Sequence, residues 1–308
     1  MATLSQYKTA RMEPSDIQGL QECVALTHFE RRLWLKKNKD WSAPRFVYKF
    51  RTLEREDTLS NGGANAFQKE SISRLRTLVV DCMLFLSSPR SFNDPFDMTA
   101  RVIVEATAEQ KRNRFEQLPE DAHPDFRESY IELLMEEDHE TLLPKAQSAF
   151  DLMINEFGVC CFVASKPDNI LMWSHYGGQH SGVCLQFECA RDPNVFGRLL
   201  PVMYRDTYPA VNWITNDGGG ISLLAKYRAW AYENEQRLIL GRAAGSFVPY
   251  NPEALTRVIV GCRADEQTRT ALSELLAERK AAGHPLIEVL HAQRAKSEYR
   301  LRFYQEVD

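Results

Sequence analysis

The order of strand-like and helix-like segments is the feature that most constrains the fold of this chain. Several segments have the alternating or short apolar pattern that is typical of β-strands. These segments are 45–51, 83–86, 158–165, 182–188, 199–204, 232–241, 255–261 and 285–292. Helical spacing dominates 264–283, where Gly283 indicates a helix end, and a short helix is expected at 221–227. The balance predicts an α+β fold with a mixed or antiparallel β-sheet.

Two further helical regions precede and interrupt the strands. Ser15 followed by Gln18 is typical of a helix start, which predicts a helix in an N-terminal extension spanning residues 1–43. Residues 105–156 are strongly acidic and place apolar residues at helical spacing. We therefore expect two or three acidic helices inserted into the main α+β domain, which spans 44–308.

The composition is that of a soluble globular protein. With 308 residues, of which 44% are hydrophobic, the chain can bury a sizeable core as one large domain or as two domains. Its apolar runs are far shorter than the roughly 20 residues of a membrane span, so we expect a cytoplasmic protein without membrane contact. The seven cysteines are odd in number and lack C-x-x-C spacing, so buried thiols are expected rather than metal ligands.

The charge is unevenly distributed along the chain. A net charge of −4 argues against a protein that coats nucleic acid indiscriminately. Residues 31–55 are nevertheless rich in Lys and Arg. This segment is either a solvated helix face or an electropositive surface for a nucleic-acid or protein partner.

Two short segments carry an unusual density of polar and aromatic side chains. The stretch from Met172 to Glu188 places Trp173, His175 and Tyr176 beside a Gly-Gly turn that permits close backbone approach. These rings belong either to the core or to a ligand site. In "SFNDPFD" (91–97), Asn93 and Asp94 precede a proline, which is typical of a turn and also compatible with a loop that shapes a site.

Four boxes together resemble a known family. They are "YKFR" (48–51), "LSSPRSFNDPFD" (86–97), "LMWSHYGGQHSGVCLQF" (171–187) and "KYRAWAYENEQRLI" (226–239). Their order is similar to the signatures of a bacterial family known as domain of unknown function 2971, over roughly 46–276. The family name implies no activity.

The layout of the boxes is also similar to that of ADP-ribosyltransferase folds, which have a split β-sheet and use NAD⁺ as a substrate. The resemblance assigns the first part to Lys49 and Arg51, the second to Tyr176 and its neighbours, and the third to Glu235 or Glu233. It implies cleavage of the nicotinamide–ribose bond and transfer of ADP-ribose to a nucleic-acid or protein acceptor. An intracellular toxin or a phage-defence effector would use such a reaction.

The residue types suit this chemistry. A carboxylate near the ribose opposes the positive charge that develops there, and Glu235 is the first candidate, with Glu233 second. We expect Glu233, Glu235 and Arg237 to alternate on one strand face, so that Arg237 keeps one carboxylate ionised. A structural ion pair is the alternative. The expected NAD⁺-binding residues are Lys49, Arg51, Asn93, Asp94, Trp173, His175 and Arg237, and the expected catalytic residues are Glu235, Glu233 and Tyr176.

Two other classes of function remain open. The same pocket could serve a non-catalytic sensor of nucleotides or nucleic acids. Alternatively, Asp94, Asp97, Glu233 and Glu235 could form a metal-dependent nuclease site. His175 and His180, which are five residues apart across a Gly-Gly turn, are poorly spaced for metal binding.

Overall fold

The structure is a computed structural model that describes residues 44–53, 64–107, 109–111, 139–215 and 218–305. The helix expected in the extension 1–43 lies outside the described residues. So do most of the basic segment 31–55 and residues 112–138 of the acidic insertion.

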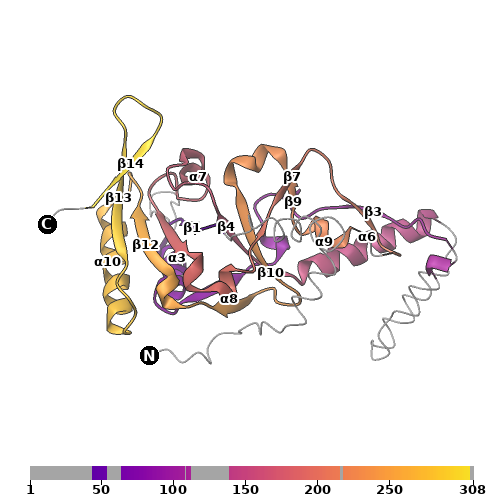
Figure 1. The fold of residues 1–308 in the computed structure, drawn as a ribbon, viewed down its shortest axis with the longest axis horizontal. Helices are drawn as coiled ribbons and strands as arrows, with labels where there is room; N and C mark the ends of the chain where they lie inside the picture. The colour runs from indigo at the N-terminus through magenta and orange to yellow at the C-terminus, as the bar shows by residue number, and fades with distance from the viewer. Residues whose placement is uncertain (1–43, 54–63, 108, 112–138, 216–217, 306–308) are drawn as a thin grey trace.

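An eight-stranded sheet forms the centre of the fold, in the order β14-β13-β12-β5-β1-β4-β10-β6 (Figure 1). The strands are β1 (Phe46–Arg51), β4 (Gly158–Val163), β5 (Val183–Glu188), β6 (Leu200–Pro201), β10 (Glu235–Leu240), β12 (Leu255–Val260), β13 (Glu288–Arg294) and β14 (Leu301–Tyr304). Neighbouring strands are antiparallel except β12 and β13, which are parallel. The prediction of an α+β fold with a mixed, mainly antiparallel sheet is confirmed.

Helices cover both faces of this sheet. On one face, α3 (Ala64–Val79) and α10 (Glu266–Ala281) pack beside each other and bury Leu75, Leu272 and Leu275 in the largest hydrophobic cluster. The short helix α7 (Ile170–His175) lies on the other face, where Trp173 contacts the ring of Phe50. No helix among the described residues is long and apolar enough to cross a membrane.

A second region extends from the β10 side of the sheet. It contains α6 (His139–Asn155), α9 (Gly219–Ser222) and two of the three two-stranded sheets, and α6 lies far from β14 (Figure 1). These two sheets pair β3 (Arg101–Ile103) with β8 (Ala210–Asn212) and β7 (Met203–Arg205) with β9 (Ala225–Tyr227), whereas the sheet of β2 (Met83–Leu86) with β11 (Ser246–Pro249) packs on α3. Short 3₁₀ helices are η3 (Pro89–Ser91), η4 (Cys189–Arg191), η5 (Arg228–Glu233) and η6 (Pro252–Ala254), and α8 (Pro193–Phe196) is a further short helix of the described residues. Phe150 of α6 and Val102 of β3 share one hydrophobic cluster.

Several predicted elements are wrong in detail. The helix expected at 221–227 is instead α9 followed by strand β9, because residues 225–227 pair in parallel with β7. The single strand expected at 199–204 is divided at Val202 into β6 and β7, which belong to different sheets. Pro201, which has no N–H to donate, lies in the edge strand β6.

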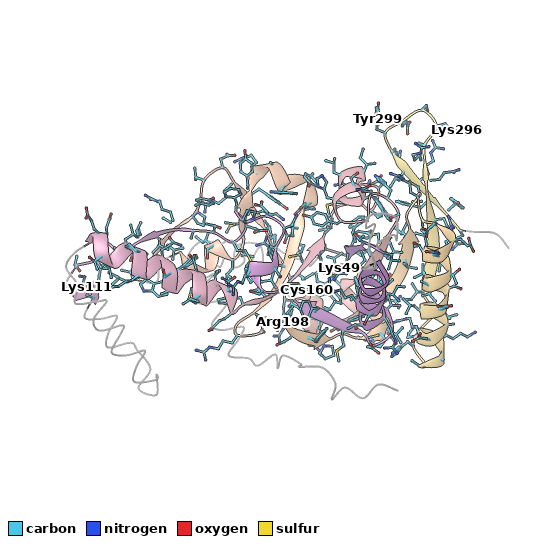
Figure 2. All side chains as sticks on the ribbon, turned by 180° about the vertical axis from the view of Figure 1, so that it is seen from behind. Lys49, Lys111, Cys160, Arg198, Lys296 and Tyr299 are labelled. Atoms are coloured by element: carbon cyan, nitrogen blue, oxygen red, sulfur yellow. The ribbon has the colours of Figure 1, made fainter. Side chains whose placement is uncertain are left out.

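The cysteines of the described residues are all free thiols. Cys82, Cys160, Cys184 and Cys189 are buried, as the sequence predicts, whereas Cys161 and Cys262 are partly buried. Cys160 lies beside Lys49 near the middle of the molecule (Figure 2), with 3.3 Å between Sγ and Nζ.

Candidate functional site

Part of one edge of β4 has no neighbouring strand, although it lies inside the sheet. Strand β1 pairs with β5 along its whole length but with β4 only at Tyr48 and Val163. Further along the same edge, the backbones of Ser87 and Val159 exchange hydrogen bonds of 2.9 and 2.8 Å. Between these two points the carbonyl of Cys161 accepts a 2.8 Å hydrogen bond from Nζ of Lys49. A side chain thus takes the place of a strand at this gap.

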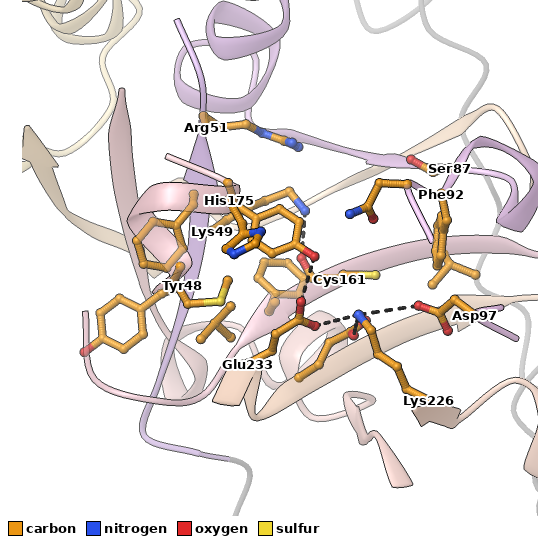
Figure 3. A pocket seen from close by; sticks show the side chains of 18 of the residues that line it. Tyr48, Lys49, Arg51, Ser87, Phe92, Asp97, Cys161, His175, Lys226 and Glu233 are labelled. Carbon is orange, nitrogen blue, oxygen red and sulfur yellow. Dashed lines mark hydrogen bonds and ion pairs between the residues drawn. The ribbon is translucent and has the colours of Figure 1, made fainter. Parts of the chain in front are cut away.

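A cavity of about 380 Å³ lies at this gap (Figure 3). Its walls come from β1, β4, the loop after β2, α7, β9 and the junction of η5 with β10. The expected site residues that line it are Lys49, Arg51, Asn93, His175, Tyr176, Glu233 and Glu235, together with Asp97 and Lys226. Three segments that are distant in the sequence therefore meet at one cavity.

Lys226 lies at the centre of a buried group of carboxylates. Its Nζ is 2.5 Å from Glu233, 2.8 Å from Glu235 and 3.4 Å from Asp97. All four side chains are almost completely buried. Sequence reasoning missed Lys226, because residues 221–227 were expected to form a helix, although the lysine opens the fourth family box.

Arg237 forms ion pairs with two of these acids, Glu235 and Asp97, but does not line the cavity. Its guanidinium is fully buried, donates to Glu235 at 2.7 Å and to both oxygens of Asp97 at 2.8 Å, and also contacts the carbonyl of Leu223 at 2.9 Å. Its contact with Glu235 is the ion pair that the sequence suggested. We call Asp97, Lys226, Glu233, Glu235 and Arg237 the charged cluster.

The charged cluster contains three acids but two bases, so one carboxylate lacks a matching base. The pKa shifts indicate that Glu233 is this carboxylate. Burial raises the pKa of Glu233, and the neighbouring Glu235 adds to the increase, although Lys226 opposes it. Burial acts in the same direction on Glu235, but Arg237 and Lys226 outweigh it and hold the pKa of Glu235 well below its usual range. Glu235 is thus a fixed anion, whereas Glu233 is the carboxyl that can accept a proton.

Glu233 does not lie on the strand. It ends the 3₁₀ helix η5, and Asn234 follows with a left-handed backbone (φ 45°) before β10 begins at Glu235. The expected alternation on one strand face is therefore wrong for Glu233 and holds for Glu235 and Arg237. The hydroxyl of Tyr176 donates a 2.6 Å hydrogen bond to Glu233, and burial together with that carboxylate raises the pKa of Tyr176.

Lys49 and Arg51 form a basic wall of the same cavity. Burial lowers the pKa of both side chains, and neither pairs with a carboxylate of the described residues. The Nε atom of Arg51 is buried and has no hydrogen-bond partner there. In Figure 3, Arg51 and Lys49 lie above the Glu233 carboxylate. An anionic ligand group at this wall would supply the missing partner.

The remaining expected binding residues lie elsewhere. Trp173 is fully buried, donates its indole N–H to the carbonyl of Pro167 at 2.7 Å, and does not line the cavity. A Cβ on Gly177 would come within 2.8 Å of the Trp173 ring, so this glycine permits close packing on the tryptophan. Asp94 accepts a 2.9 Å hydrogen bond from the backbone of Phe96 and lines a different cavity.

The carboxylates proposed for a nuclease site do not gather around a free space. Asp97, Glu233 and Glu235 converge on the Lys226 ammonium, and Asp94 lies apart from them. Within the described ranges, no group of three or more His, Cys, Asp or Glu side chains is arranged to hold a metal ion.

Four of the five residues of the charged cluster and most of α7 fall within one family match. Residues 172–238 match the family model described as "Protein of unknown function (DUF2971)". The match supports a similarity to the DUF2971 family over this segment. The DUF2971 match is narrower than the expected 46–276 and includes Tyr176, Lys226, Glu233, Glu235 and Arg237, but not Lys49 or Asp97. No curated protein and no solved structure gives a significant match.

Proposed function

We propose that the 380 Å³ cavity binds the nicotinamide riboside half of NAD⁺ and that the protein transfers ADP-ribose to an acceptor. The observation that carries this proposal is the convergence on one cavity of Tyr176 and Glu233 with two bases, Lys49 and Arg51, that form no ion pair with a described carboxylate. The gap between β1 and β4 is similar to the split sheet expected of ADP-ribosyltransferase folds and supports the same conclusion.

The charges of the cavity fit the two ends of the ligand. The pyrophosphate is anionic, and Lys49 and Arg51 offer it positive charge and hydrogen-bond donors. Nicotinamide in NAD⁺ is a cation, and the excess negative charge of the charged cluster attracts it. The exposed ring of His175, which packs edge-on against Trp230, is the candidate for contact with the nicotinamide ring.

The proposed reaction exchanges one bond at the ribose C1′ carbon. The bond from C1′ to the pyridinium nitrogen breaks, its electron pair goes to that nitrogen, and neutral nicotinamide leaves. The acceptor nucleophile forms a new bond to C1′ and gives its proton to the carboxylate of Glu233. The raised pKa of Glu233 suits this role as general base.

In this proposal Glu235 keeps the role that the sequence suggested, whereas Glu233 accepts the proton. Arg237 and Lys226 keep it ionised, so it acts as a fixed negative charge that opposes the positive charge developing on the ribose. Tyr176 is a positioning residue that holds the Glu233 carboxylate through its 2.6 Å hydrogen bond.

The test is release of nicotinamide from labelled NAD⁺. We expect wild type to release it and Glu233→Gln to lose at least about 100-fold in rate, the size typical of a general base. Glu253→Gln, which changes an exposed glutamate on η6, is the matched control and should leave the rate unchanged. Absence of nicotinamide release by the wild type, or full activity of Glu233→Gln, would refute the proposal.

One observation favours a second function, a non-catalytic nucleotide sensor. Lys226 already contacts both Glu233 and Glu235, so neither carboxylate is free in the absence of a ligand. A sensor would bind NAD⁺ in calorimetry and return it unchanged. A role as a toxin or phage-defence effector stays a prediction in either case.

A further inference from the structure

A second cavity, of about 880 Å³, is also lined by Lys226. It is lined by the loop 94–101, the segment 205–209 after β7, and β9. We propose that this cavity binds a nucleotide of a single-stranded nucleic acid, which would be the acceptor of the reaction. The binding claim stands by itself, whereas the role as acceptor rests on the proposed function.

Three exposed aromatic side chains from three different segments line this cavity. Phe96 is 62% exposed, Tyr208 47% and Tyr227 54%. Large rings scattered singly on a surface need no explanation, but rings that share one hollow indicate a binding site. Nucleobases of any sequence stack on such rings, because every base has a flat π-face.

The same cavity offers positive charge that is not already used. Arg101 and Arg205 line it, are exposed, and form no ion pair with a carboxylate of the described residues. Asp206, which also lines the cavity, pairs with Arg228 at 3.0 Å. Exposed guanidinium groups without a described carboxylate partner, beside exposed rings, match a phosphate next to a base. An acidic peptide would satisfy the arginines but would leave the rings without flat partners.

The two cavities share a wall. Lys226 lines both of them, and Asp97 and Asp94, three residues apart in one loop, line the first and the second respectively. A base held by Phe96 and Tyr227 would therefore lie beside Lys226 of the charged cluster, in a cavity that Lys49 does not line. An acceptor bound there would leave the cavity proposed for the dinucleotide unobstructed.

The binding claim is tested with fluorescein-labelled single-stranded RNA and DNA hexanucleotides, by anisotropy, without NAD⁺. Tyr208→Ala and Tyr227→Ala should each weaken binding of at least one hexanucleotide roughly tenfold or more, as expected for loss of one stacked base. Tyr299→Ala is the matched control, because Tyr299 is 99% exposed at the tip of the β13–β14 turn (Figure 2) and should not change the affinity. Arg101→Gln should reduce the salt dependence of binding by about one unit of log–log slope.

The binding claim is overturned if neither hexanucleotide binds the wild type, or if Tyr227→Ala binds as well as Tyr299→Ala. The acceptor role is tested separately, by comparing nicotinamide release in buffer with transfer of labelled ADP-ribose to the hexanucleotide. Tyr227→Ala should lose transfer and keep release. Equal transfer by Tyr227→Ala and wild type, or labelling of protein alone, would overturn the acceptor role. Hexanucleotide binding without any nicotinamide release would refute the proposed function and leave the binding site in place.

Discussion

Replacing Lys226 by methionine tests whether the charged cluster is a buried network of ion pairs. Methionine keeps most of the volume of the lysine stem but removes the ammonium that contacts Glu233 at 2.5 Å and Glu235 at 2.8 Å. Three buried carboxylates would then face Arg237 alone. Removing one partner of a buried ion pair costs about 3–5 kcal/mol.

The loss is measurable by urea denaturation. With an m-value of about 3 kcal/mol/M, a loss of about 4 kcal/mol lowers the midpoint by about 1.3 M. Arg228→Met is the matched control, because Arg228 pairs with Asp206 at 3.0 Å with both side chains more than half exposed. This exposed pair should contribute less than about 1 kcal/mol.

The double variant Lys226→Met with Glu233→Gln isolates the charge effect. It removes one positive and one negative charge, so the cluster has the same net charge as in the wild type. We expect the double variant to recover about 2 kcal/mol of the stability lost in Lys226→Met, because an uncompensated buried carboxylate is removed. The reasoning is refuted if Lys226→Met costs no more than Arg228→Met, or if the double variant loses as much as the sum of the two single variants.

Three further variants test other parts of the site. Because folding raises the pKa of Glu233 above its ordinary value of 4.5, ionising it costs stability, so urea midpoints of wild type should fall relative to Glu233→Gln as pH rises above 4.5. A wild-type midpoint that rises relative to that of Glu233→Gln over this pH range would contradict the raised pKa of Glu233. Trp173→Phe should lower stability by about 1–3 kcal/mol, through lost packing and the lost hydrogen bond, while the KM for NAD⁺ stays unchanged. A raised KM for NAD⁺ would indicate that Trp173 belongs to the binding site after all. Lys49→Met should raise the KM for NAD⁺ roughly 10- to 100-fold, as expected for a charge-assisted contact, and an unchanged KM would remove Lys49 from the phosphate site.

Most strands of the central sheet were predictable because their local pattern agrees with their burial, whereas β14 was not predicted. β1, β4, β5 and β12 each carry runs of apolar residues whose alternate side chains enter different cores. The limits of α10 follow from local signals, since Asp265 caps its first turn through the N–H of Thr268 and Gly283 adopts a positive φ after its end.

The elements that were missed depend on contacts between distant residues. β9 has three residues, and its pairing with β7 decides its conformation. The ion pair of Arg237 with Asp97 joins positions 140 residues apart, so no local spacing could reveal it. The sequence around Trp173 would look the same whether its ring packs in the core or contacts a ligand. Only the fold distinguishes it from Tyr176, which lines the cavity.

A crystal structure of the Glu233→Gln variant with NAD⁺ tests the central claim most directly. The account predicts nicotinamide riboside in the cavity between β1 and β4, with the pyrophosphate at Lys49 and Arg51 and the ribose C1′ facing position 233. A dinucleotide bound elsewhere, or a cavity that stays empty at saturating NAD⁺, would contradict it.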